Sequence, residues 1–80
     1  MSRTMKLNDG DSIVTAWAEN VNGPGWSNQL IWVLIRERGG KLREEAIQPS
    51  DRTEAMATLH DVCAVATKEL TAWVEAIYKP

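Results

Sequence analysis

The chain has 80 residues, a formal net charge of −2, a pI near 5.3 and one cysteine. This length allows one domain, residues 1–80, which buries only about 60–65% of its unfolded surface and is marginally stable unless a partner adds buried area. One cysteine excludes an internal disulfide, and one cysteine with one histidine excludes a structural zinc site. The net acidity argues against a protein that coats nucleic acid.

Residues 1–11 are polar and contain the turn signal Asn8-Asp9-Gly10-Asp11, so we expect them to be frayed. Residues 12–19 carry β-branched and aromatic side chains, which predict a first strand. A loop is expected over residues 20–28, where asparagine, glycine and proline are concentrated. No N-terminal apolar segment precedes these elements, and no run approaches the roughly 20 apolar residues that span a bilayer. We therefore expect a cytoplasmic protein without a membrane segment.

The predicted loop presents Trp26 behind a rigid Gly23-Pro24-Gly25 frame, and Asn28 follows. A rigid loop that carries an indole can anchor a partner with little ordering cost, and tryptophan is enriched at recognition surfaces. The alternative is that Trp26 folds back to close one end of the core, since tryptophan is often largely buried. Trp26 and Asn28 are our first candidate partner-binding residues.

A second strand is predicted over residues 29–37, and its first seven residues, Gln-Leu-Ile-Trp-Val-Leu-Ile, are apolar at odd and even positions. Successive side chains of a strand point to opposite faces, so both faces of this strand are apolar. It is expected to be the central strand of a small sheet. The amphipathic segment that follows covers one face, and we expect a protein partner or a second copy, giving a homodimer, on the other.

The charges around Gly39-Gly40 decide the length of the next loop. A two-residue loop would set like charges opposite each other, which destabilises a strand pair. A three-residue loop sets Glu37 opposite Lys41 and puts a glycine at the left-handed position that such loops use. We predict the three-residue loop and a third strand over residues 41–48.

Four cations surround the tip of this hairpin, and in the sequence only Glu37 opposes them: Arg36, Arg38, Lys41 and Arg43. A cluster of this kind can bind phosphates or an acidic protein surface, so all four are candidate partner-binding residues. The alternative is a solvated turn that protects a strand edge from aggregation.

Apolar residues recur at steps of three and four over residues 50–78, which predicts a helical segment that begins with a capping box at Asp51. One helix of this length would be about 42 Å long, against about 26 Å for an eight-residue strand. It must overhang the sheet, break, or reach a second subunit, and Val65 with Thr67 is the weakest region for a break. The predicted buried stripe is Met56, Leu59, Cys63, Ala66, Leu70, Trp73 and Ile77, widened by Ala55, Val62 and Val74, and it leaves out Thr58.

No catalytic pattern is visible. Glu44 and Glu45 are neighbours in a strand and point to opposite faces, so they cannot act as a carboxylate pair. His60 and Cys63 have no group to orient a base and no oxyanion site, and we expect Cys63 to pack in the core. We therefore expect no enzyme, no cofactor and no metal site.

The predicted fold class is α+β, with a three-stranded antiparallel sheet over residues 12–48 packed by one long or two shorter C-terminal helices. This order of elements resembles small antitoxin domains of the HicB type. Size, acidity and the missing active site also resemble phage-encoded anti-defence inhibitors such as anti-CRISPR proteins, a likeness of class over the whole chain that no motif carries. That likeness implies a non-enzymatic inhibitor that binds a host complex. The alternative is a nucleic-acid-binding or regulatory, antitoxin-like module that uses the basic hairpin tip.

Overall fold

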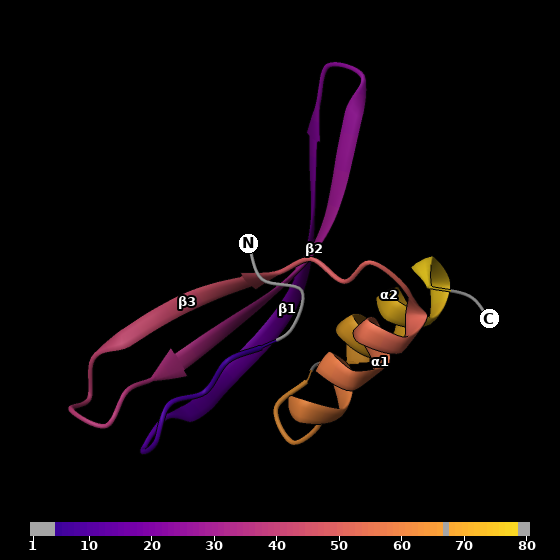
Figure 1. The fold of residues 1–80 in the computed structure, drawn as a ribbon. Coiled ribbons are helices and arrows are strands. Elements are labelled where there is room, and N and C mark those ends of the chain that lie inside the picture. Colours follow the sequence, from indigo (N-terminus) through magenta and orange to yellow (C-terminus); the bar gives the residue numbers. More distant parts are fainter. Residues whose placement is uncertain (1–4, 67, 79–80) are drawn as a thin grey trace.

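The structure is a computed structural model that describes residues 5–66 and 68–78. Its fold is the expected α+β arrangement, in which an antiparallel sheet of order β1-β2-β3 precedes two helices (Figure 1). The central position of the doubly apolar strand is confirmed. The elements are β1 (Ser12–Gly23), β2 (Trp26–Arg36), β3 (Leu42–Ile47), α1 (Arg52–Asp61) and α2 (Lys68–Ile77).

The loop between β2 and β3 has the three residues that the charge pattern predicts. The Glu37 amide donates to the Lys41 carbonyl at 2.7 Å, and the Gly40 amide donates to the Glu37 carbonyl at 2.8 Å. Gly40 has a φ of 92°, so a glycine does occupy the left-handed position.

The loop expected over residues 20–28 is wrong, because β1 and β2 continue pairing through most of it. Their last paired residues are Gly23 and Trp26, which leaves Pro24-Gly25 as a two-residue turn. Proline at the first turn position and Gly25 with a φ of 75° at the second fit a type II turn. A turn this tight lets the backbone groups of the flanking asparagine-rich segments bond to each other, and this pairing outweighs their weak strand propensity.

The outer part of this hairpin, residues 20–29, stands clear of the rest of the molecule, and we call it the arm (Figure 1). The Cα radius of gyration is 12.7 Å, with extents of 40 × 27 × 19 Å. A compact domain of this length would have a radius of gyration of about 11.6 Å. The arm accounts for the elongation.

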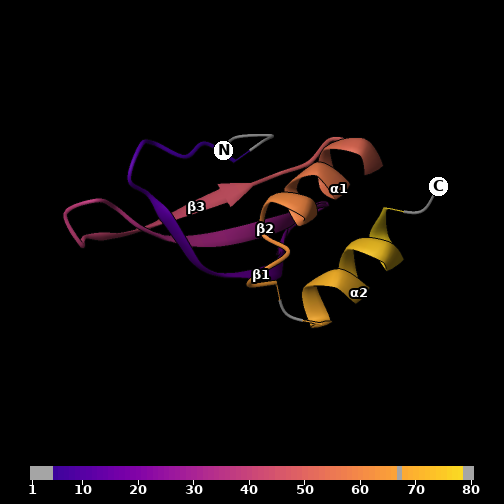
Figure 2. The ribbon, with the colours of Figure 1, turned by 90° about the horizontal axis from the view of Figure 1, so that it is seen from below.

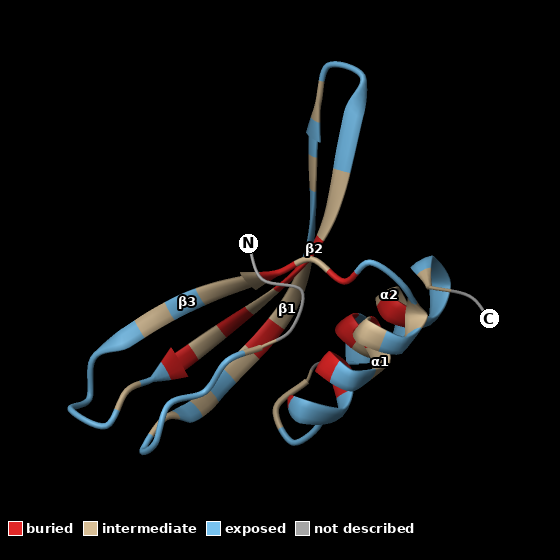
Figure 3. Cartoon of the chain, viewed as in Figure 1, coloured by how far each residue is buried: buried red, intermediate tan, exposed pale blue. Residues whose placement is uncertain are grey.

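The helices lie next to each other beside one face of the sheet (Figure 2). The core forms between the helices and that face of the sheet. No residue of the arm, residues 20–29, is buried in it (Figure 3). The buried core residues are Ala16, Ile31, Val33, Ile35, Ile47, Ala55, Leu59, Val62, Leu70 and Val74. In β2 these are the odd-numbered positions, so the even-numbered positions face away from the helices.

The helical segment breaks in the region around Val65, as its length and β-branched residues indicate; Thr67 lies outside the described residues. Asp51 caps α1 by accepting a hydrogen bond from the Glu54 amide at 2.9 Å. Beyond Asp61 the helical period is interrupted, so of these two neighbouring residues of the predicted stripe Val62 is buried as expected and Cys63 is not. Cys63 is therefore exposed, and its predicted packing in the core is wrong.

The fraying expected for residues 1–11 can be compared with the structure only from residue 5 onward. Met5 packs against the core, and the Asn8 amide donates to the Asp11 carboxylate at 2.8 Å. Residues 5–11 thus form a strap on the helix-covered face of the sheet. No helix among the described residues is long and apolar enough to cross a membrane.

Candidate functional site

Trp26 lies at the end of the arm with 51% of its surface exposed, away from the core. Its indole lies over Gly23 on the paired strand: a Cβ added to Gly23 would stand 2.1 Å from the ring. The absence of a side chain at Gly23 therefore makes the room in which the indole rests. Of the two alternatives for Trp26, the structure excludes the one in which it closes the core.

The arm carries no charged residue between Glu19 and Leu30. Its polar groups are amides and a hydroxyl, and it is bounded at the tip by the Pro24-Gly25 turn. Asn28 sits near the base, half buried, where its Oδ1 accepts a hydrogen bond from Gln48 Nε2 at 3.0 Å. This bond ties the arm to the segment after β3, so Asn28 supports the arm more than it presents a free amide to a partner.

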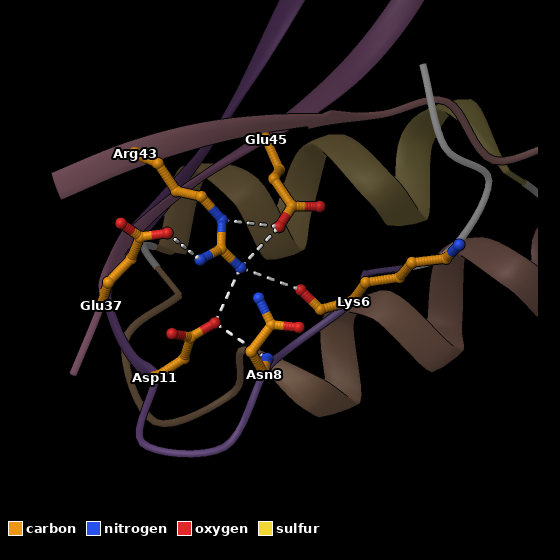
Figure 4. A network of polar contacts seen from close by, with 6 residues as sticks. All are labelled: Lys6, Asn8, Asp11, Glu37, Arg43 and Glu45. Atoms are coloured by element: carbon orange, nitrogen blue, oxygen red, sulfur yellow. Dashed lines mark hydrogen bonds and ion pairs between the residues drawn. The ribbon is translucent and has the colours of Figure 1, made fainter. Parts of the chain in front are cut away.

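Arg43 departs most from the expected basic cluster, because its guanidinium is surrounded by acceptors (Figure 4). It forms ion pairs with Asp11 at 2.8 Å, Glu37 at 3.0 Å and Glu45 at 3.0 Å, and it also donates to the Lys6 carbonyl at 3.3 Å. In the sequence only Glu37 opposes the four cations. Asp11 and Glu45 complete the neutralisation, so Arg43 fastens the N-terminal strap and is not free to bind phosphate.

The electrostatics of this network follow from its geometry. The hydrogen bond from Arg43 holds the pKa of Asp11 below its ordinary value, since that bond favours the charged carboxylate. The same bonds raise the pKa of Arg43, which is charged in any case. The Asp11 side chain is only 3% exposed, which strengthens the pairing relative to a surface ion pair.

Three cations of the predicted cluster remain exposed around the hairpin tip: Arg36, Arg38 and Lys41. None of them forms an ion pair with a described residue. The Arg38 side chain rests against Gly10 of the strap, where an added Cβ would stand 2.8 Å from it. The structure therefore brings three of the four predicted cations to one solvent-exposed end of the molecule, and assigns the fourth to a structural role.

A second surface lies on the side of the sheet away from the helices, and we call it the open face. Trp17 and Trp32 stack on it with ring centroids 6.4 Å apart and an interplanar angle of 13°. Trp32 Nε1 is buried there without a hydrogen-bond partner among the described residues. Strand alternation and register give its members as Ser12, Thr15, Trp17, Glu19, Leu30, Trp32, Leu34, Arg36, Leu42, Glu44 and Ala46.

The open face carries apolar side chains that lie outside the helix-covered core, among them Trp17, Trp32 and Leu34. Leu42 at its margin is 50% exposed. Of its residues only Arg36 was among the candidate site residues, although the apolar even positions of residues 29–35 predicted an uncovered face. It is the apolar surface that the described helices leave uncovered.

Among the described residues, no group of three or more histidine, cysteine, aspartate or glutamate side chains is placed to hold a metal ion. His60, in the last turn of α1, and Cys63, in the turn that follows it, are both exposed. No family model, curated protein or solved structure matches the chain. We therefore infer the function from the arm, the hairpin tip and the open face.

Proposed function

We propose that this protein is a non-enzymatic inhibitor that binds a protein partner, in the manner of phage-encoded anti-defence proteins that block a host complex in the cytoplasm. The observation that carries this proposal is the uncharged arm that holds Trp26 half exposed at its tip. The resemblance to anti-CRISPR proteins rests on class alone, and it suggests a host defence complex as the partner.

Binding energy at protein interfaces concentrates in a few anchors, and tryptophan is among the commonest. Trp26 is already ordered by its contact with Gly23 and by the Pro24-Gly25 turn, so little conformational entropy is lost when it is buried. An arm without charges also avoids the cost of removing unpaired ions from water. These features suit insertion of the arm into a groove on a partner.

The test is partner capture by Trp26→Ala, with Ser27→Ala, at the exposed neighbouring position, as the matched control. We expect the tryptophan variant to lose the complex that the wild type captures from host lysate, with an unchanged circular dichroism spectrum. The serine variant should capture it normally. A Trp26 variant that folds and still binds would show that the partner contacts another surface.

The alternative function, a nucleic-acid-binding or antitoxin-like module, is favoured by one observation: Arg36, Arg38 and Lys41 are exposed and unpaired in the described chain. Phosphate binding by three cations should make the logarithm of the affinity fall with the logarithm of salt concentration at a slope of about −2.7. Binding through Trp26 should depend little on salt. A titration of the captured partner at several salt concentrations separates the two.

We further propose that the chain self-associates, at least to a dimer, at micromolar concentration. The open face gives the reason, because an 80-residue domain gains stability by covering stacked tryptophans that its own helices leave uncovered and only partly buried. Light scattering should then give a mass above the 8.9 kDa of one chain.

A further inference from the structure

We propose that two copies pack open face against open face, with their β2 strands antiparallel, so that Arg36 of each copy meets Glu19 of the other. This inference rests on the self-association proposed above and adds its surface and geometry. It identifies the partner of the open face as a second copy of this chain, and leaves the arm free for a different protein.

The register of the sheet fixes the order of side chains along the open face. Antiparallel partners point to the same side of a sheet, so each β1–β2 pair forms one rung of this face. A β-bulge at Val14 lies between the first and second rungs and keeps the later ones aligned on the same side. From the hairpin tip toward the arm, the rungs are Ser12–Arg36, Thr15–Leu34, Trp17–Trp32 and Glu19–Leu30.

Charge is distributed with opposite signs at the two ends of this series. Arg36 stands at one end and Glu19 at the other, both exposed, with Thr15–Leu34 and Trp17–Trp32 between them on β1 and β2; Glu44, beside Leu34 on the edge strand β3, is a further exposed charge at the side of the face. The two rungs lie six residue steps apart along β2, about 20 Å at 3.3 Å per residue, so the charges cannot pair within one copy. Neither forms an ion pair with a described residue.

A two-fold axis that lies in the plane of the interface, perpendicular to the strands and midway between the Leu34 and Trp32 rungs, makes this pattern of charges self-complementary. It lays the Arg36 rung of one copy over the Glu19 rung of the other, and it does so twice, as an isologous interface requires. The apolar rungs then cover one another. An axis parallel to the strands would instead set Arg36 over Arg36, which like-charge repulsion disfavours.

The dimensions of the face indicate a weak dimer. Seven residues of β2 and three strands span about 23 Å by 14 Å, a flat footprint of roughly 300 Å² against roughly 800 Å² for each partner of a standard interface. Upright tryptophan rings enlarge the accessible area beyond the flat footprint. We therefore expect dissociation in the micromolar range, where association is easily measured and easily shifted by single charges.

The experiment is sedimentation equilibrium of Arg36→Glu, of Glu19→Arg, and of their equimolar mixture. Each variant alone sets two like-charge contacts into the dimer, and we expect its dissociation constant to rise roughly tenfold. In the mixture, each altered side chain meets an opposite charge on the other copy, at both contacts. The mixture should therefore dimerise like the wild type.

Two controls carry the same change in net charge away from the open face: Arg38→Glu in the hairpin loop and Glu75→Arg on α2. Both should dimerise like the wild type. A monomeric wild type would overturn self-association itself. A dimeric wild type whose single variants dimerise equally well, or whose mixture stays monomeric, would overturn this geometry and leave the arm proposal untouched, because that proposal is tested by partner capture.

Discussion

A single guanidinium, that of Arg43, decides where the N-terminal strap lies, because it joins Asp11 of the strap to Glu37 and Glu45 of the sheet. The contact between Arg43 and Asp11 spans 32 residues of sequence. Such a partner cannot be predicted from the charges in the sequence, because the strap is polar and its path over the sheet depends on the tertiary structure. The basic hairpin tip could therefore be predicted, but not that one of its cations is neutralised.

The Arg43–Asp11 pair predicts how stability depends on pH. The pKa of Asp11 is lowered from its ordinary 3.8 by folding, so the pair's stabilisation is present above pH 3.8 and is lost as the pH falls through the lower folded value. The unfolding free energy of Asp11→Asn should thus lie below that of the wild type at neutral pH, and the gap should shrink below pH 3.8. Urea titrations across this range measure it.

Asp9→Asn is the matched control for this prediction, because Asp9 lies exposed in the same turn and forms no ion pair with a described residue. Its unfolding free energy should stay close to that of the wild type throughout. An Asp11→Asn gap that does not change with acidity would mean that the charge of Asp11 is not what holds the strap.

Gly23 determines the position of the Trp26 indole. A methyl group there would occupy the place of the ring, so Gly23→Ala should displace the indole and weaken partner capture, while the core, which neither residue enters, stays intact. Fluorine NMR of 5-fluorotryptophan should show the Trp26 resonance shifted. Gly39→Ala has no atom within 4 Å of its new methyl group and should shift nothing. An unshifted Trp26 resonance in Gly23→Ala would mean that the indole does not rest on Gly23.

Among the elements, the two helices show what a hydrophobic stripe can and cannot predict. It places Leu59 and Leu70 in the core correctly, but it leaves out Thr58, which is 1% exposed and donates its hydroxyl to the Glu54 carbonyl at 3.0 Å. A threonine can be buried on a helix because its hydroxyl finds a carbonyl one turn earlier. Sequence periodicity treats it as polar and misses this.

Leu70→Ala should lower the free energy of unfolding by about 2–5 kcal/mol, because Leu70 is 1% exposed and its loss leaves a cavity between α2 and the sheet. Thr53→Ala, on the exposed side of α1, should change it by less than about 0.5 kcal/mol. Chemical unfolding of both variants checks this. Equal midpoints would mean that α2 does not pack on the sheet as the structure has it.

The two hairpins differ in how far the sequence determines them. Charges flanking the second hairpin exclude one register and leave the other, so its loop could be predicted to the residue. In the first hairpin, the segments beside Pro24-Gly25 have loop-like composition, and only pairing along the whole arm makes them strands. In the arm, the backbone hydrogen bonds between β1 and β2 outweigh the weak strand propensity of the residues, and this pairing cannot be read from local sequence.

At the scale of the whole molecule, the arm and the rest of the domain, which we call the body, have different roles. The core lies between the helices and one face of the sheet, and the arm extends beyond it. In the proposed dimer the β2 strands are antiparallel, so the two arms leave from opposite ends. Each would present one Trp26, and a partner with two grooves at that spacing would bind with an avidity that single arms lack.

This division predicts that the body folds without the arm. Replacing residues 20–29 by Asn-Gly joins the paired residues Glu19 and Leu30 through a two-residue hairpin turn. The loss includes the Asn28–Gln48 hydrogen bond, worth about 1 kcal/mol, so the melting temperature should fall by less than about 8 °C. Circular dichroism should show the helices retained, while partner capture should be lost. A variant that unfolds would make the arm part of the folding unit, and one that folds and still captures the partner would move the binding site off the arm.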